Sequence, residues 1–356
     1  MLCQQNPRVA STTRGTCFLA LRQKSSQAIL RFIPLANICE VFRAYIGGCY
    51  VKSLDQFRVS AFFFRLCLFF AVGIIAVNGF GQAPTAVPAP VPPAVAIPRP
   101  SAEEVKIIED GLEKFLKSAD PKVKEINKKY PGMISVKMPP PNSAIVPNLA
   151  QFFQRQHQAN LEVARKGDID VLFMGDSITD FWRNAEGAYA GKPVLDKYWG
   201  HLKVANFGIA GDTTQGVLYR LQNGEGKGFS PKAVMLMIGT NNTSNNANTA
   251  PEIAEGVGAV VLELQKDFPN AKILLLGIFP RGTANDPVRK TIAEINSIIS
   301  KLNDGKRVYY LDIGAKFLDA DGNIPRDIMS DALHPGPKGY EIWAEAVKDK
   351  LAELMK

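Results

Sequence analysis

The chain has no cysteine after residue 67, and it has only three histidines in 356 residues. Its main part therefore has no disulfide framework, no thiolate metal site and no cysteine nucleophile. His157, His201 and His334 come from three distant segments, so a metal site built on several histidines is not expected. We predict that the protein works without a metal and without a cofactor.

The main part of the chain also lacks an excess of charge of either sign. The net charge of +8 comes almost entirely from residues 1–83, which contain 9 Lys and Arg against 2 Asp and Glu. Residues 84–356 contain 33 and 32, so the basic surface that nucleic acid requires is absent there. We expect no nucleic-acid partner.

The first 83 residues are typical of an export signal that is preceded by an N-terminal extension. Residues 1–51 have no sustained period, and we expect a non-native or disordered extension, with translation starting near residue 51. Residues 52–83 combine basic residues, an uncharged run over 66–77 and a small-residue end, as a signal peptide does. The alternative is an uncleaved anchor, since residues 59–77 are just long enough to span a bilayer. Either way, we predict an extracytoplasmic protein, secreted or periplasmic, that contacts a membrane only through this segment if it is not cleaved.

Two further segments precede the main domain. Residues 84–100 alternate Pro, Ala and Val, which predicts an extended linker. Residues 101–148 begin with a capping box, Ser101 and Glu104, and contain apolar residues at helical spacing, which predicts a helical extension.

Residues 149–356 alternate between apolar strands and amphipathic helices. We predict strands over 171–174, 204–207, 233–238, 273–278 and 308–311. A helix capped by Asn148 is expected to run to about residue 166, and further helices are expected over 213–221, 251–266, 287–302 and 337–356. This alternation indicates a parallel sheet with helices on both faces.

Four polar clusters follow the strands or precede the last helix, at 175–177, 206–214, 239–242 and 331–334. The carboxyl ends of parallel strands share one edge of a sheet, so these clusters can converge. Each cluster alone is more simply explained as a turn or a helix cap. Their order along the chain and their place at strand ends favour a common site.

The residue types in these clusters fit acyl transfer. Ser177 is the candidate nucleophile, and His334 is the candidate base that removes its proton. Asp331 lies three residues before His334, where it can orient the imidazole. The Ser177 and Gly211 N–H groups and the Asn241 side-chain amide are candidate donors to an oxyanion.

The same clusters resemble the SGNH (GDSL) hydrolase superfamily, and within it the platelet-activating-factor acetylhydrolase type of catalytic subunit. The matching blocks are Gly175-Asp176-Ser177, Asn206 to Thr214, Gly239-Thr240-Asn241-Asn242 and Asp331-Ala332-Leu333-His334, with similar segments at 220–225 and 280–282. The resemblance covers residues 150–356, with Ala210 as a departure where relatives tend to have glycine. It implies a flavodoxin-like, doubly wound, five-stranded parallel sheet in three α/β/α layers, and metal-free ester hydrolysis through an acyl-enzyme.

The sequence favours a small ester or an acetylated glycan as the substrate. An exported protein with a neutral main domain meets glycans more readily than it meets a cytosolic phospholipid, so carbohydrate O-deacetylation is the first hypothesis. A short-chain lipid esterase of the platelet-activating-factor acetylhydrolase type is the second. A non-catalytic exported binding module and a membrane-tethered scaffold remain as alternatives outside enzymology. The oligomeric state is left open.

Overall fold

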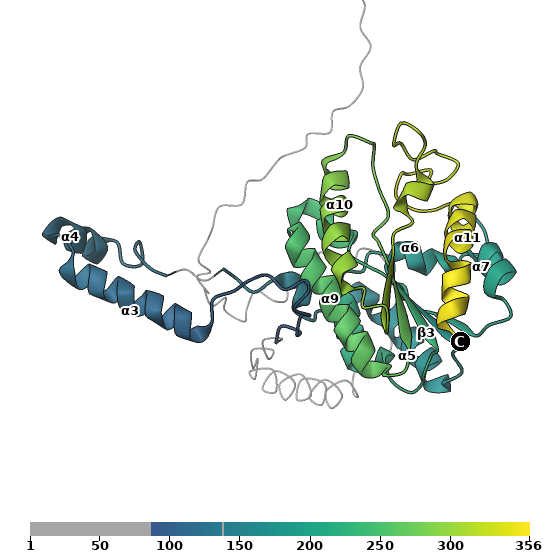
Figure 1. Cartoon of the computed structure of the whole chain (residues 1–356), viewed down its shortest axis with the longest axis horizontal. Coiled ribbons are helices and arrows are strands. Elements are labelled where there is room, and N and C mark those ends of the chain that lie inside the picture. The colour runs from purple at the N-terminus through teal and green to yellow at the C-terminus, as the bar shows by residue number, and fades with distance from the viewer. Residues whose placement is uncertain (1–86, 137–138) are drawn as a thin grey trace, which may run out of the picture. The chain divides into compact units, whose positions relative to one another are not determined.

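A five-stranded parallel sheet forms the centre of the main domain in the computed structural model, which describes residues 87–136 and 139–356 (Figure 1). The strand order is β2-β1-β3-β4-β5, and every neighbouring pair is parallel. The strands are β1 Val171–Gly175, β2 Val204–Asn206, β3 Ala233–Met237, β4 Lys272–Leu276 and β5 Val308–Leu311. The predicted doubly wound sheet is confirmed, and each strand lies where the sequence placed it to within two residues.

Helices cover both faces of the sheet, because successive strand residues point to opposite sides (Figure 1). On one face Leu172, Val234 and Ile273 pack with α8 Thr214–Arg220, α9 Ala250–Asp267 and α10 Pro287–Ile299. On the other face Val171 and Phe173 pack with α7 Lys192–Trp199 and α11 Pro337–Leu354. Burial on both sides explains why the strands are continuous apolar runs. The three-layer arrangement implied by the resemblance is confirmed.

The helices differ from the prediction mainly at two places. Their bounds are α5 Gln154–Lys166, α6 Ser177–Asp180, α7 Lys192–Trp199, α8 Thr214–Arg220, α9 Ala250–Asp267, α10 Pro287–Ile299 and α11 Pro337–Leu354, with short helical turns η2 Ser143–Ile145, η3 Gln151–Phe153, η4 Phe181–Arg183, η5 Leu221–Glu225, η6 Asn241–Asn246, η7 Ser300–Leu302 and η8 Gly314–Phe317. Helix α7 was not predicted, since it is short and has no side-chain cap. Helix α5 starts later than expected because the Asn148 N–H donates to Gln215 O, 3.1 Å away.

The prediction that residues 84–100 form a linker is corrected by the structure. Residues 87–99, which we call the strap, pack against the main domain. The strap is extended, but Ala89 and Val95 are buried in the main core. The Ala89 N–H donates to Ile145 O at 2.7 Å. At its end, Arg99 forms two hydrogen bonds of 2.7 and 2.6 Å to the buried carboxylate of Glu255 on α9. A Pro-, Ala- and Val-rich composition predicts extension, but it does not exclude packing of the apolar side chains.

The predicted boundary at 149 is also corrected. Ala144 and Ile145 are buried, and the Asn142 amide donates to Glu255 Oε2 at 2.9 Å. The main domain therefore begins with the strap, is interrupted after Arg99, and resumes at Asn142.

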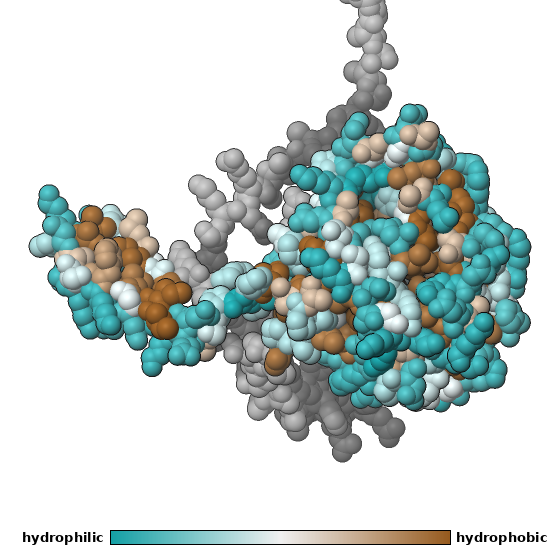
Figure 2. Space-filling view, viewed as in Figure 1, coloured by the Kyte–Doolittle hydropathy of each residue, from teal (hydrophilic) through white to brown (hydrophobic). Residues whose placement is uncertain are grey.

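The interruption contains α3 Ala102–Ser118 and α4 Pro121–Lys129, as the sequence predicted. Both bonds of the Ser101–Glu104 capping box are present, at 3.2 and 2.7 Å. Neither helix has a buried residue, and Ile108 and Phe115 on α3 are exposed. Figure 2 shows hydrophobic surface gathered on this helical pair. No helix among the described residues is long and apolar enough to span a bilayer. The predictions for residues 1–51 and 52–83 lie outside the described residues.

Candidate active site

Ser177 is placed by the sharp turn from β1 into α6. Asp176 is the N-cap residue of α6, and its Oδ1 accepts the Ile178 N–H at 3.0 Å. Because the cap is made by Asp176, the Ser177 hydroxyl is left to bond elsewhere. Gly175 allows the turn to close, since a Cβ there would lie 2.3 Å from both Met237 O and Thr179 Oγ1.

Ser177, His334 and Asp331 lie in one line of hydrogen bonds, although 157 residues separate the first two. The Ser177 Oγ lies 2.9 Å from His334 Nε2, and His334 Nδ1 lies 2.7 Å from Asp331 Oδ2. An Nδ1–H that donates to Asp331 leaves Nε2 as the acceptor for the serine proton. The structure thus brings together the three side chains that the sequence suggested as nucleophile, base and orienting carboxylate.

The turn that carries Asp331 and His334 is held tightly. Asp331 Oδ1 accepts the Leu333 and His334 N–H groups at 3.0 and 2.8 Å. Between them, Ala332 has a φ of 55°, a left-handed conformation that is uncommon outside glycine. Its carbonyl accepts the Gly282 N–H at 2.8 Å, which fastens the turn to the loop after β4.

Asp331 is held in its charged form. Burial raises the pKa of the Asp331 carboxyl, but hydrogen bonds from the backbone and ring of His334, from Leu333 and from Tyr189 outweigh it, so its pKa lies below the ordinary value. A charged Asp331 is suited to stabilise an imidazolium at His334.

Tyr189 is a site residue that the sequence reasoning missed. Its hydroxyl donates to Asp331 Oδ2 at 3.0 Å, and its ring lies 5.3 Å from that of His334 and stacks on Phe181 at 5.6 Å. It comes from an irregular loop without apolar period, between Gly187 and Gly191, where no pattern marks it.

The candidate oxyanion donors come from three neighbouring strand ends. Gly211 has a φ of +86°, which favours glycine, in the loop after β2. Asn241 begins η6 after β3, and its Nδ2 donates to Asp212 O at 2.8 Å, so the second N–H of this amide is left for a substrate. The Ser177 N–H is in the first turn of α6, where it has no acceptor within the helix.

The glycine loop is fixed from the side of α6 and η4. Asp180 Oδ2 accepts the Ala210 N–H at 2.8 Å, and the Arg183 guanidinium donates to Gly208 O at 3.1 Å. Ala210 itself is exposed, so the methyl group that departs from the family pattern meets no crowding in this loop.

A buried ionic chain supports the same loop from below. Asp212 accepts two hydrogen bonds from Arg220, at 2.9 and 2.8 Å, and Arg220 also pairs with Glu225. Glu225 in turn accepts from His157 Nδ1 at 2.8 Å. His157 is therefore a buried member of this ionic chain. His201 lies apart, in the segment between α7 and β2.

No group of three His, Asp or Glu side chains suited to a metal ion occurs among the described residues.

Comparison with known proteins gives consistent matches. The model of the GDSL-like Lipase/Acylhydrolase family matches residues 173–342. Platelet-activating factor acetylhydrolase IB subunit alpha2 of Rattus norvegicus is 34% identical over 221 residues, which is 60% of this chain and 92% of that protein. The alpha1 subunit from the same organism is 34% identical over 187 residues, covering 52% and 76%.

Two solved structures are similar to this chain over most of their own length. A putative acylhydrolase from Bacteroides fragilis has a TM-score of 0.48 and 18% identity, covering 57% of this chain and 97% of that one. A catalytic mutant of an acetylxylan esterase from Geobacillus stearothermophilus has a TM-score of 0.40 and 25% identity, covering 52% and 94%.

Proposed function

Since this chain belongs to the GDSL-like lipase/acylhydrolase family and is a carboxylic ester hydrolase, we propose that it is an exported, metal-free serine esterase that removes acetyl groups from carbohydrate O-esters. The observation that carries the proposal is the hydrogen-bonded order Ser177, His334, Asp331. Such an order activates a hydroxyl that is otherwise a weak nucleophile.

The reaction follows from the positions of these groups. Ser177 Oγ attacks the ester carbonyl while His334 Nε2 takes the hydroxyl proton, and Asp331 stabilises the imidazolium that forms. The tetrahedral intermediate collapses to an acyl-enzyme, and the departing alcohol takes the proton from His334. Water, deprotonated by His334, then attacks the acyl-enzyme and releases the acid and Ser177.

The oxyanion of each tetrahedral intermediate would lie among the Ser177 N–H, the Gly211 N–H and the free N–H of the Asn241 amide. Each such donor contributes on the order of 3 kcal/mol to lowering the barrier. No step requires a metal, so a chelator is expected to leave turnover unchanged.

Three observations support the finer parts of the proposal. The curated relatives are named acetylhydrolases, which favours a short acyl group. Residues 52–83 have the composition of a signal peptide, which favours export. The near-neutral charge of residues 84–356 favours an uncharged substrate such as a glycan over an anionic surface. Fractionation of cells that express the full chain tests the export.

The second candidate is a short-chain lipid esterase. It is favoured by the 34% identity to a protein named platelet-activating factor acetylhydrolase. A substrate panel that includes a short-chain phospholipid ester and an acetylated oligosaccharide separates the two.

The chemistry is tested by p-nitrophenyl acetate, butyrate and octanoate. We expect turnover to fall steeply with chain length, and Ser177→Ala to lower kcat at least about a thousandfold, since the residual rate then depends on the oxyanion donors alone. Ser297→Ala, on the exposed side of α10, is the matched control. Equal turnover in wild type and Ser177→Ala would refute the serine mechanism, whereas no turnover in wild type would favour a binding module.

A further inference from the structure

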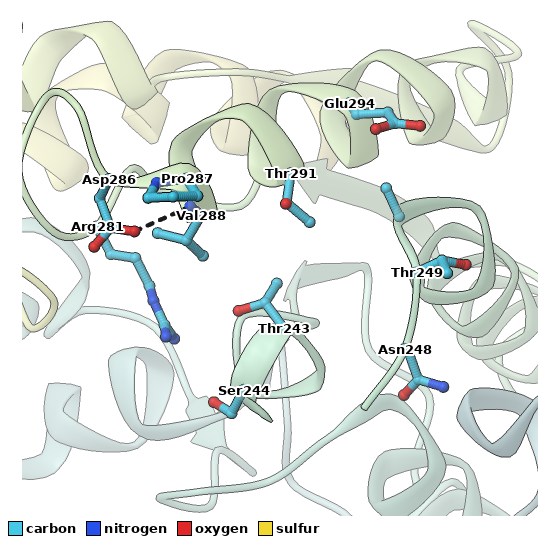
Figure 3. Close-up of a pocket in the computed structure, with 11 residues that line it drawn as sticks. Thr243, Ser244, Asn248, Thr249, Arg281, Asp286, Pro287, Val288, Thr291 and Glu294 are labelled. Carbon is cyan, nitrogen blue, oxygen red and sulfur yellow. Dashed lines mark hydrogen bonds between the residues drawn. The ribbon is translucent and has the colours of Figure 1, made fainter. Parts of the chain in front are cut away.

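A cavity of about 640 Å³ with a mixed polar and apolar lining opens at the carboxyl edge of the sheet, the edge that also carries the candidate active site (Figure 3). It lies between the segment that follows β3 and the first turns of α10. Its polar lining includes Thr243, Ser244, Arg281, Asp286, Thr291 and Glu294. The volume is within the range of roughly 300–1,000 Å³ that is common for small-molecule sites.

The wall of the cavity is continuous with the candidate catalytic loops. Thr243 follows Asn241 by two residues in η6, and a 3₁₀ helix advances only about 2 Å per residue. Arg281 Nη1 donates to Thr240 O at 3.3 Å. The next residue, Gly282, is bonded to Ala332 in the turn that carries His334. A group held in this cavity would therefore border both an oxyanion donor and the turn of the candidate base.

The lining has the chemistry of a site for a neutral polyol. Figure 3 shows Thr243, Thr291 and Arg281 extending from three different segments toward the cavity. Hydroxyl groups both donate and accept, the guanidinium only donates, and carboxylates only accept, so together they match the mixed demands of sugar hydroxyls. One Arg stands against the two carboxylates of Asp286 and Glu294, which disfavours an anion. No aromatic residue lines the cavity, and the apolar residues of its lining are Ala250, Pro287 and Val288.

We propose that this cavity binds the carbohydrate alcohol from which the acyl group is removed, a step that rests on the proposed carbohydrate esterase function. Arg281 donates to sugar oxygens from the side of the oxyanion donors. Thr291 and Glu294, one turn apart on α10, accept from the hydroxyls on the opposite side. The acyl group itself remains at Ser177, so the cavity selects the alcohol and not the acid.

The test compares two substrates that share the acetyl group. An acetylated xylo-oligosaccharide presents a sugar alcohol to the cavity, whereas p-nitrophenyl acetate has a small leaving group without hydroxyl groups to match. In the full-length protein, Thr291→Tyr narrows the cavity and Arg281→Met removes its donors. Each is expected to lower the ratio of kcat/KM on the oligosaccharide to kcat/KM on p-nitrophenyl acetate at least tenfold.

Ser297→Tyr is the matched control, because it places the same ring on an exposed position of the same helix, outside the cavity. Its ratio should equal that of wild type. If wild type hydrolyses both substrates and neither cavity variant changes the ratio, the cavity inference is wrong while the carbohydrate esterase stands. If wild type hydrolyses p-nitrophenyl acetate but no acetylated oligosaccharide, the carbohydrate function fails and the cavity inference with it. A selective loss on a short-chain phospholipid ester instead would also overturn the inference.

Discussion

Tyr189 stabilises the candidate triad from outside it. Asp331 Oδ2 accepts from both His334 Nδ1 and the Tyr189 hydroxyl, so the same oxygen orients the imidazole and is itself oriented by the phenol. The Tyr189 ring also packs on the imidazole and on Phe181. Tyr189 is thus a positioning residue, which acts on the ester only through Asp331 and His334.

Tyr189→Phe should therefore lower kcat without unfolding the protein. The variant keeps the ring packing and loses one hydrogen bond to a charged group, which is worth about 1.5–3 kcal/mol. We expect a fall of roughly tenfold in kcat on p-nitrophenyl acetate, with little change in KM. Tyr198→Phe is the matched control, since its hydroxyl lies within hydrogen-bond distance of Glu341 and Glu345 in another part of the chain. Equal kinetics in the two variants would contradict the positioning role.

Asp176 is a buried carboxyl beside the candidate nucleophile. Its Oδ1 caps α6, while Oδ2 is buried without a hydrogen-bond partner among the described residues. Burial raises the pKa of Asp176 to about 7, with a smaller contribution from the charge of Asp212. The folded protein therefore holds this proton to higher pH than the unfolded chain does.

The contribution of Asp176 to stability should consequently fall as the pH rises from about 4 to about 7. A carboxyl whose folded-state pKa is raised contributes stability that is complete below its unfolded pKa, near 3.8, and lost as the pH passes its folded value, about 7. In this window the loss is at most about 1.4 kcal/mol per pH unit. Asp176→Asn cannot titrate at this position. The unfolding free energy of the variant minus that of wild type, measured by urea titration, should therefore increase as the pH rises. Asp110→Asn, on the exposed face of α3, is the control, and parallel curves for Asp176→Asn and wild type would refute the assignment.

At the scale of elements, the loop after β2 depends on the helix that follows it. Asp212 accepts from Arg220 on α8, while its carbonyl accepts from the Asn241 amide. One residue therefore joins the buried ionic chain to a candidate oxyanion donor. Gly216, in the first turn of α8, leaves the space that the Asp212 carboxylate occupies.

Gly216→Ala is expected to disturb both stability and turnover. An added Cβ would lie 1.8 Å from Asp212 Oδ1, and the two hydrogen bonds to Arg220 prevent that carboxylate from moving away freely. Overpacking of this kind costs about 1–3 kcal/mol. A displaced Asp212 also shifts Gly211 and Asn241, so we expect kcat on p-nitrophenyl acetate to fall about tenfold or more.

Gly111→Ala provides the comparison for this substitution. Nothing lies within 4 Å of a Cβ at Gly111 on α3, so the change only favours the helix. Urea unfolding and steady-state kinetics of the two variants should differ clearly. A Gly216→Ala variant with the stability and kcat of wild type would show that the ionic chain does not hold the loop.

The sequence predicts those parts of the fold in which local pattern and burial agree. Apolar runs such as 171–174 are buried on both faces, so their position and the polar residues that follow them could be found without a structure. Ser177, Asp331 and His334 could be named because parallel strands share a carboxyl edge. Arg220 and Glu225 could not, because charged residues are ordinarily solvated and only tertiary contacts show that this pair is buried. The strap was misread for a related reason, since composition predicts its extended backbone but not the surface on α9 that receives it.

At the scale of the whole molecule, Glu255 joins the two ends of the interruption in the main domain. Arg99 before the interruption and Asn142 after it both bond the carboxylate of Glu255, which is fully buried. Burial raises the pKa of this group, but the hydrogen bonds from Arg99, Ile97 and Asn142 outweigh it and hold the pKa below the ordinary value. The main domain is therefore closed at Glu255 whatever the intervening chain contributes.

It follows that residues 103–138 should be dispensable for the main domain. Neither α3 nor α4 has a buried residue. The residues at both ends of the interruption, Arg99 and Asn142, already bond to one side chain, that of Glu255. Replacing 103–138 by a short Gly/Ser linker should leave kcat/KM on p-nitrophenyl acetate within about twofold, because few contacts of the core are lost.

Glu255→Ala is the complementary change, since it removes the anchor and keeps the helices. Removing one partner of a buried ion pair costs about 3–5 kcal/mol, and the half-exposed position of Arg99 places the expected loss below that range. Limited proteolysis of Glu255→Ala should then cut within the strap. In the variant with the Gly/Ser linker, which keeps Glu255, the strap should resist cleavage. The exposed Glu162→Ala on α5 serves as the control. If the linker variant lost stability or activity while Glu255→Ala did not, the helical pair and not the Glu255 junction would be what completes the main domain.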